Sequence, residues 1–317
     1  MSNDTSDAGD SSDPSESSIY RGHSDNVFRI ACSPSGQRIA SASRDRTVQV
    51  WRVPTGEERL VYQEHASPLL SVAWSPDGRY IASGDTAGGV NVWDASSGKT
   101  ILTYRGHTRF VRGLAWSPNG RYIASGGDYG DSTAQVWEAL TGKLLYTHTR
   151  QYRIFAVAWE PGGKLLASCS FDGSVQVWNA FIGELSLAYQ EHIGPLYAAA
   201  WSPHAIFIAS GGQDGLVRVW EAATGKTTST YAGHTKAVKA LAWSPDSQYI
   251  VSGGDDLTLH IWQAGTGKRI ALFNGYTKWI RSVAWSSNGK YVASASGRII
   301  KIDYLSFNRP SSPFSVR

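Results

Sequence analysis

Short runs of alternating apolar and polar residues, separated by turn residues, fill most of the chain. Residues 73–84, "AWSPDGRYIASG", hold two such runs around a turn, and residues 115–127 and 242–254 repeat the text closely. Pro76 presets φ and Gly78 tolerates the left-handed region, as a tight hairpin requires. Period-two alternation over about five to seven residues predicts strands, and no segment has a helical period. The chain is predicted to be all-β.

Two series of tryptophans define an internal period. The first series follows at steps of 41 to 44 residues, and the second keeps nearly the same step: Trp51, Trp93, Trp137, Trp178, Trp220 and Trp262; then Trp74, Trp116, Trp159, Trp201, Trp243 and Trp285. With Cys32 at the tryptophan position of the first copy, the chain holds seven units. One four-stranded sheet cannot bury both faces alone, but sheets around an axis can. The period therefore predicts a closed seven-bladed propeller with four antiparallel strands per blade.

The repeated text resembles the WD40 family over residues 19–304. Its marks are the period of about 42 residues, an upstream Gly-His, an Asp before the third strand and a Trp at its end; the Trp-Asp pair itself occurs once, at Trp93-Asp94. The similarity among repeats and the self-contained length are most like bacterial stand-alone WD40 proteins, and this resemblance implies an adaptor role. Residues 17–20 align with the residues before Gly106, so an N-terminal strand is expected to close the ring in the last blade.

The last unit departs most from the repeat, so the seam, where the ring closes in the last blade, is expected to be less stable than the other blades. Tyr276 replaces His, Gly297 or Arg298 stands at the Asp position, and Asp303 or Tyr304 replaces Trp.

Charge divides the chain into a tail and a body. Residues 1–18 carry five acids, no base and almost nothing apolar, so they are predicted to form a disordered acidic tail. The remaining 30 basic and 21 acidic residues give the body a charge of about +9. That surface either is simply solvated or attracts acidic partners. Residues 305–317 form a C-terminal tail without an assigned role.

The chain shows no signal peptide and no apolar run near the roughly 20 residues of a membrane span, so a cytoplasmic location is expected. Cys32 and Cys169 lie in apolar runs and are interpreted as small buried hydrophobes. Neither a metal site nor a cofactor is expected.

A His, a Ser, an Asp and a Trp recur together in several units. In antiparallel strands the Gly-His loop and the Asp turn lie at the same end of the sheet, and the resemblance implies a hydrogen-bonded tetrad. The sets are His23, Ser41, Asp45 and Trp51; His107, Ser125, Asp131 and Trp137; His192, Ser210, Asp214 and Trp220; His234, Ser252, Asp256 and Trp262. An active site has no reason to be repeated around a ring, so a structural role is predicted.

Two units break this pattern. In the second, the acid Asp85 is shifted by two positions, and in the fourth, Arg150 replaces His, which leaves Asp172 partly unsupported or paired differently.

Catalytic motifs are absent from the sequence. Residues 97–100 and 224–227 echo a phosphate loop, but Trp93 and Trp220 stand where its first Gly is required. No metalloprotease spacing or nucleophile elbow occurs. An enzyme is not expected.

The resemblance to WD40 proteins also implies that positions before the "AW" of each unit, and positions just before the Asp turn, line a partner-binding top face. They vary from unit to unit, and aromatics and arginines, which are enriched in binding hot spots, dominate them. They are Phe28, Arg44, Leu70, Phe110, Arg112, Arg153, Phe155, Phe171, Tyr197, Lys239, Trp279 and Arg281. A monomeric ring that binds a protein or peptide with acidic and apolar anchors is predicted. A glycan or a nucleic acid is the alternative ligand, and exposed positions that vary freely are the alternative explanation.

Overall fold

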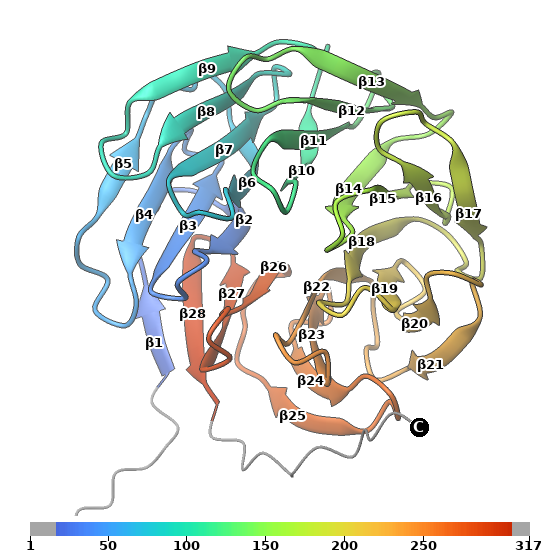
Figure 1. The fold of residues 1–317 in the computed structure, drawn as a ribbon. Coiled ribbons are helices and arrows are strands. Elements are labelled where there is room, and N and C mark those ends of the chain that lie inside the picture. The colour runs from blue at the N-terminus through green and yellow to red at the C-terminus, as the bar shows by residue number, and fades with distance from the viewer. Residues whose placement is uncertain (1–16, 306–317) are drawn as a thin grey trace, which may run out of the picture.

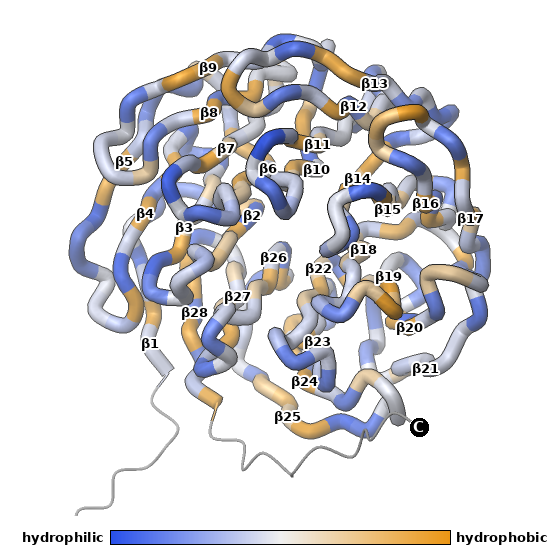
Figure 2. Tube along the Cα trace, in the orientation of Figure 1, coloured by the Kyte–Doolittle hydropathy of each residue, from blue (hydrophilic) through white to orange (hydrophobic). Residues whose placement is uncertain are grey.

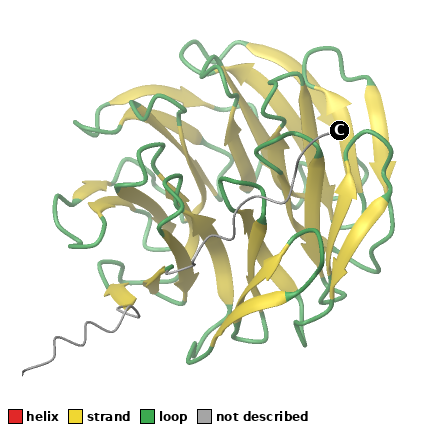
Figure 3. Ribbon diagram, turned by 60° about the horizontal axis from the view of Figure 1, so that its bottom comes forward, coloured by secondary structure: helices red, strands yellow, loops and turns green. Residues whose placement is uncertain are grey.

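The computed structural model describes residues 17–305, which form seven four-stranded antiparallel sheets around a central axis (Figure 1). Strands and loops make up this whole part of the chain (Figure 3). With no helix among them, residues 17–305 contain no helical membrane span. The predicted all-β seven-bladed propeller is therefore confirmed. Residues 1–16, which are predicted to be disordered, and residues 306–317 of the C-terminal tail lie outside the described residues.

The strand nearest the axis comes first in each blade. In blades 1 to 7 it is β2 (Val27–Cys32), β6 (Leu69–Trp74), β10 (Val111–Trp116), β14 (Ile154–Trp159), β18 (Leu196–Trp201), β22 (Val238–Trp243) and β26 (Ile280–Trp285). The second strand is β3 (Arg38–Ser43), β7 (Tyr80–Asp85), β11 (Tyr122–Gly127), β15 (Leu165–Ser170), β19 (Phe207–Gly212), β23 (Tyr249–Gly254) and β27 (Tyr291–Ser296).

The third and outer strands complete each sheet. The third is β4 (Val48–Arg52), β8 (Val90–Asp94), β12 (Thr133–Glu138), β16 (Val175–Asn179), β20 (Val217–Glu221), β24 (Leu259–Gln263) and β28 (Ile299–Tyr304). The outer strand is β5 (Leu60–Tyr62), β9 (Thr100–Tyr104), β13 (Leu144–Thr149), β17 (Leu185–Tyr189), β21 (Thr227–Tyr231), β25 (Arg269–Phe273) and, in blade 7, β1 (Ser17–Tyr20).

The turn between the first two strands of a blade is stabilised by hydrogen bonds among its own residues. In blade 2, Gly78 has a φ of +70°. The backbone N–H of Arg79 donates to Asp77 Oδ1 at 3.0 Å, and that of Tyr80 donates to Ser75 Oγ at 2.8 Å. Because these bonds are local, the hairpin is encoded by the repeated Ser-Pro-Asp-Gly text.

Tryptophans at the ends of the inner strands connect neighbouring blades. In four of them the indole N–H donates to a backbone carbonyl in the inner strand of the preceding blade: Trp74 to Ala31 at 3.1 Å, Trp116 to Ala73 at 3.2 Å, Trp159 to Ala115 at 3.2 Å and Trp243 to Ala200 at 3.1 Å. The indole nitrogens of Trp201 and Trp285 have no hydrogen-bond partner within residues 17–305. Figure 2 shows hydrophobic residues along the inner strands and hydrophilic residues in many of the loops around the opening. The core is therefore a series of interfaces between blades rather than one central cluster.

The ring is closed by the start of the chain. β1 pairs with β28 in the order Ser17 with Asp303 to Tyr20 with Ile300, so Ser17 and Ser18, which the sequence assigned to both tail and strand, belong to the strand. The Tyr20 ring stacks on Trp51 of blade 1 at 4.2 Å. The predicted closure is confirmed.

Blade 7 has all four strands, although its polar residues differ from those of the other blades. Asp303 pairs with Val292 in the register that a tryptophan occupies elsewhere, as Trp93 does opposite Ile81. Tyr276 takes the His position, and its hydroxyl lies 2.8 Å from Ser294 Oγ. Burial raises the pKa of Asp303, although Lys301 lies 2.8 Å from its carboxylate. Whether this seam is weaker than the others stays a prediction.

Two truncations test the contribution of β1. Deleting residues 1–20 removes β1 and the Tyr20 stack and exposes one edge of β28, so the free energy of unfolding should fall by about 3 kcal/mol or more. Deleting residues 1–16 leaves β1 intact and is the matched control. Thermal unfolding followed by circular dichroism provides the comparison. Equal melting of the two truncated proteins would contradict closure by β1.

Candidate functional site

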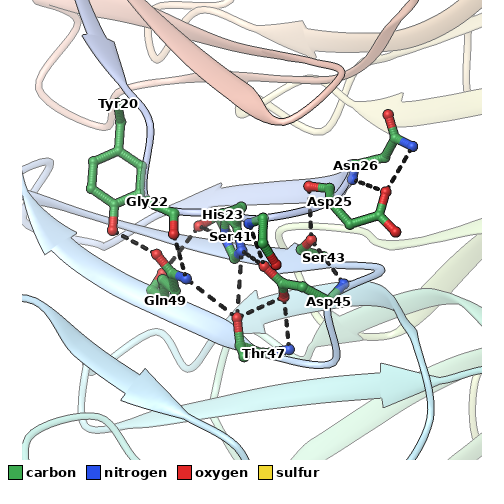
Figure 4. A network of polar contacts seen from close by, with 11 residues as sticks. Tyr20, Gly22, His23, Asp25, Asn26, Ser41, Ser43, Asp45, Thr47 and Gln49 are labelled. Atoms are coloured by element: carbon green, nitrogen blue, oxygen red, sulfur yellow. Dashed lines mark hydrogen bonds and ion pairs between the residues drawn. The ribbon is translucent and has the colours of Figure 1, made fainter.

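The His, Ser and Asp of blade 1 form a connected polar network (Figure 4). His23 Nδ1 lies 2.8 Å from Asp45 Oδ2, and His23 Nε2 lies 2.8 Å from Ser41 Oγ. Thr47 Oγ1 donates to Asp45 Oδ1 at 2.7 Å. The loop before β2 and the turn before β4 are thus joined at one end of the blade.

The same network recurs in blades 3, 5 and 6. The His Nδ1 to Asp distance is 3.1 Å for His107 and Asp131, 2.9 Å for His192 and Asp214 and 2.8 Å for His234 and Asp256. The tryptophan indole donates to the serine hydroxyl: Trp137 to Ser125 at 3.0 Å, Trp220 to Ser210 at 3.2 Å and Trp262 to Ser252 at 3.2 Å. These twelve residues are brought together as the sequence predicted.

Trp51 departs from its predicted tetrad. Within residues 17–305 its buried indole nitrogen has no hydrogen-bond partner, whereas the Ser41 hydroxyl donates to the Gln49 carbonyl at 3.2 Å. His23, Ser41 and Asp45 therefore form a triad, while the Trp51 indole keeps its stack on Tyr20.

The two irregular blades recover the network by different routes. The shifted acid of blade 2 still meets its histidine, since His65 Nδ1 lies 2.8 Å from Asp85 Oδ2. In blade 4, Arg150 Nη2 donates to Asp172 Oδ2 at 2.9 Å, so an ion pair replaces the His–Asp bond. Of the two alternatives for Asp172, the structure therefore supports different pairing. A displaced or substituted side chain still finds its partner because the loop and the turn share one end of the sheet.

Tyrosines of the outer strands complete these networks, and the sequence analysis missed them. Each stacks on the tryptophan of the next blade, with ring centroids 4.4 Å apart for Tyr62 and Trp93, 4.2 Å for Tyr104 and Trp137, 4.4 Å for Tyr189 and Trp220 and 4.9 Å for Tyr231 and Trp262. Between blades 3 and 4 a histidine takes the place of the tyrosine, since His148 of β13 stacks on Trp178 of β16 at 4.6 Å. The signal was present, because an aromatic residue regularly stands three positions before the histidine.

Hydrogen bonding determines the protonation of the tetrad acids. Burial alone would raise the pKa of Asp256, but the hydrogen bond from His234 and the charge of that histidine hold the pKa well below its usual value. The same balance lowers the pKa of Asp45 through His23 and of Asp131 through His107. These carboxylates therefore stay ionised and accept hydrogen bonds, which is a structural role rather than that of a proton donor.

One group of metal-ligand types occurs among the described residues, namely His234, Asp256 and His260, whose ligand atoms lie within 4.8 Å of one another. Their nitrogens already have partners: His260 Nδ1 bonds Tyr231 at 2.6 Å and Nε2 bonds Thr258 at 2.9 Å. Burial lowers the pKa of His260 to about 4, so the ring is neutral at pH 7. A metal would have to break these bonds, and the absence of a metal site stays a prediction.

Burial raises the pKa of both Cys32 and Cys169 to about 12. Each free thiol is therefore protonated near pH 7 and unsuited to act as a nucleophile or a metal ligand.

Every inner strand has a β-bulge at its second residue. Strand pairing passes from Val111 to Gly113 in β10, for example, and leaves Arg112 as the extra residue. A bulge changes the direction of a side chain. The seven extra residues are Phe28, Leu70, Arg112, Phe155, Tyr197, Lys239 and Arg281. All seven line one cavity of about 240 Å³, together with Arg29, Asp255 and Trp279. We call this cavity the channel mouth.

Cations lie against aromatic rings in the channel mouth. Arg112 pairs with Asp128, and its guanidinium lies 5.7 Å from the centre of the Phe155 ring. Lys239 Nζ lies 3.3 Å from Asp255 Oδ2 and 3.4 Å from the centre of the Tyr197 ring. The Arg281 guanidinium lies 4.9 Å from Phe28 and 5.4 Å from Trp279. Such a surface suits acidic and apolar groups.

The other predicted top-face residues lie outside the cavity lining. Arg153 stacks on Phe171 at 5.3 Å and on Tyr129 at 4.4 Å, beside the channel mouth. Arg44 lies 3.8 Å from Asp25, and Phe110 is half-buried before β10.

Sequence reasoning missed the contribution of Asp128 and Tyr129. They lie in the longest spacing of the first tryptophan series, from Trp93 to Trp137, and that irregularity was the available signal.

Comparison with known proteins agrees with this geometry. The family model "WD domain, G-beta repeat" matches residues 15–52, 56–94, 98–138, 141–179, 183–221, 225–263 and 267–302. The chain belongs to the WD40 repeat family. WD40 propellers generally act as protein-interaction scaffolds and are typically non-catalytic. Each matched segment holds the outer strand of one blade and the first three strands of the next. The repeat unit of this WD40 protein therefore bridges two blades.

Similarity to curated proteins is confined to about one repeat. The chain is 47% identical over 38 residues to a ribosome biogenesis protein BOP1 homolog of Monosiga brevicollis, and 46% identical over 41 residues to that of Drosophila virilis. These matches cover 12% and 13% of the chain and 5% of either relative. They are consistent with the family, and no bacterial relationship is confirmed by them.

Replacing Trp220 with Ala should lower the free energy of unfolding by about 3 to 5 kcal/mol, because it removes a fully buried indole, the Tyr189 stack and the bond to Ser210. Urea unfolding of the variant and the parent measures this loss. A variant that melts within a degree or two of the parent would show that the tetrad contributes little.

The lowered pKa values of the tetrad acids predict acid sensitivity. A group whose pKa is lower in the folded state contributes stability above its unfolded pKa, near 3.9, and loses it as the pH falls through the folded pKa. Stability should therefore drop below about pH 4. In Asp256→Asn the drop should be shallower, and urea unfolding across a pH series measures both slopes. Identical slopes would mean that Asp256 does not contribute.

Proposed function

We propose that this WD40 protein is a non-catalytic scaffold that binds a partner protein or peptide at the channel mouth. The supporting observation is that seven bulges, one in each blade, direct seven side chains of five residue types into one cavity. The His–Asp bond, by contrast, is the same in blades 1, 2, 3, 5 and 6. Variation that is concentrated at one site suits recognition of an asymmetric ligand.

The chemistry of the partner follows from the lining. Arg112, Lys239 and Arg281 favour acidic groups, while Phe155, Tyr197 and Trp279 offer aromatic surface for apolar anchors. An acidic segment with apolar side chains is the ligand that uses both. We propose that the propeller acts as a monomer in the cytoplasm. The short matches to BOP1 homologs do not support a role in ribosome biogenesis for this chain.

A matched pair of triple variants tests the proposal. Phe155, Tyr197 and Trp279 are replaced by Ala in one protein, and Leu140, Ile182 and Ile206 are replaced by Ala in the other. The second set is exposed by 50%, 64% and 56% and lies in turns at the opposite end of blades 3, 4 and 5. Only the first variant should lose a protein that the parent captures from its native lysate, by at least about tenfold, since a few anchor residues dominate interfaces.

Both variants are first compared with the parent by thermal unfolding, so that a lost partner reports binding rather than folding. Equal capture by the first variant and the parent would overturn a binding site at the channel mouth. Capture that collapses with salt and is abolished by nuclease would favour a nucleic acid. Competition by free sugars would favour a glycan.

A further inference from the structure

Five exposed cations gather where blades 7 and 1 meet, at the end of the ring that carries the Asp turns. Each belongs to a loop or turn at that end: Arg21 in the loop before β2, Arg44 and Arg46 in the turn between β3 and β4, Lys278 in the loop before β26, and Arg298 in the turn between β27 and β28. We call these five residues the seam patch. None of them lines the channel mouth.

Hydrogen bonds hold these loops together across the two blades. Three of them connect the relevant segments: from Ser296 Oγ to the Lys278 carbonyl at 2.6 Å, from the Val27 N–H to the Gly297 carbonyl at 2.7 Å, and from the Arg44 N–H to the Asn26 carbonyl at 2.9 Å. The second bond joins blade 7 to blade 1, while the first lies within blade 7 and the third within blade 1. Closure of the ring therefore brings the five cations onto one continuous surface.

The seam patch has an excess of positive charge. Asp25 lies 3.8 Å from Arg44, and the other acid of these loops, Asp45, accepts hydrogen bonds in the polar network of blade 1. Five cations against these two acids leave a net charge of +3. Within residues 17–305 the side chains of the four cations other than Arg44 form no hydrogen bond or ion pair. A surface of this charge attracts anionic groups.

Arg46 has a backbone conformation that favours glycine. Its φ is +69°, and the same turn position holds glycine in blades 2, 4 and 5, where Gly88, Gly173 and Gly215 have φ values of +91°, +83° and +73°. A side chain in this left-handed region carries a steric cost that glycine avoids. The fold therefore does not require an arginine at this position, and its exposed guanidinium is available to a ligand.

The residues that precede β1 carry the complementary charge. Residues 1–16 hold five acids and no base, and an acid stands at every third position: Asp4, Asp7, Asp10, Asp13 and Glu16. An extended chain with three residues per turn would place all five carboxylates on one side, about 9 Å apart. Carboxylates spread over that length suit cations that are spread over several loops.

Residues 1–16 join the fold close enough to reach the seam patch. Ser17 pairs with Asp303 of β28, and Arg298 lies five residues from Asp303 along the chain, roughly 17 Å away. Sixteen residues extend to about 50 Å, so the five acids can span the patch from this attachment point. Attachment also gives the segment a high local concentration, which compensates for the small contribution of each exposed ion pair.

We propose that residues 1–16 dock on the seam patch through their five carboxylates. The contact goes beyond the proposed function and does not involve the channel mouth, so either can fail without the other. It is electrostatic, and added salt weakens it. While the segment is docked, another polyanion binds the seam patch only after displacing it. The N-terminal segment thus shields this basic surface.

Cleavage of the full chain after Glu16 by a glutamate-specific protease reports whether the segment is docked. The test variant combines Arg46→Gly, Lys278→Gln and Arg298→Gln, and the control variant combines Ser132→Gly, Lys143→Gln and Lys226→Gln. Ser132 holds the equivalent turn position in blade 3, with a φ of +54°, and the two control lysines are exposed in turns at the opposite end of the ring. Both variants keep residues 1–16 unchanged, so the protease meets the same cleavage site.

At low salt the test variant should be cleaved about three- to tenfold faster than the parent, because only the undocked segment is accessible to the protease. The control variant should be cleaved at the parent rate, and about 0.5 M NaCl should remove the difference. Deleting residues 1–16 should strengthen the binding of poly-glutamate by a similar factor. Arg46→Gly alone should melt at or near the parent temperature, because glycine fits this turn.

Equal cleavage of the parent and the test variant would overturn the proposal, as would poly-glutamate binding that is unchanged by the deletion. Protection that increases with protein concentration would also overturn it, because the docked segment would then come from a second copy of the chain. Should Arg46→Gly melt well below the parent, that arginine is structural. The double variant Lys278→Gln and Arg298→Gln then decides by the same cleavage measurement.

Discussion

Each blade depends on contacts that it cannot make by itself. The stack of an outer-strand aromatic ring on the third-strand tryptophan of the next blade is the clearest case, from Tyr20 on Trp51 onward. A four-stranded sheet has two apolar faces, and both are covered only when a neighbour lies on each side. The ring must therefore close, and the first strand of the chain closes it by pairing with the last.

The polar networks follow from the same constraint. Loops and turns at one end of the blades are held close together, so their polar groups need partners within the protein. The His–Asp bonds supply these partners, and an arginine or a shifted acid serves equally well where the repeat has changed. Recurrence around the ring thus reflects a recurring structural need. Catalysis would call for one set with distinct surroundings.

The β-bulge at the second residue of each inner strand lets one residue line the cavity without disturbing the strand pairing that maintains the sheet. Pairing on either side of the bulge maintains the sheet, while the extra residue is free to vary because it makes no ladder bond. Seven independently variable side chains consequently meet in one cavity. Arg29 adds charge from a position that is small in the other blades, so blade 1 contributes two residues to the channel mouth.

The period of the tryptophans and the turn residues between them determined the fold, the number of blades and the way the ring closes, because each is a property of one repeat and its count. The tetrads of blades 3, 5 and 6 were predictable for the same reason. Only the tertiary structure decided three features: the Trp51 indole that lacks a hydrogen-bond partner, the pairing of Arg112 with Asp128 within blade 3, and the meeting of Arg29, Arg112 and Arg281 in one cavity. The first two depend on side chains that depart from the common repeat, and the third joins residues of blades 1, 3 and 7, whose distances depend on how the closed ring positions the blades.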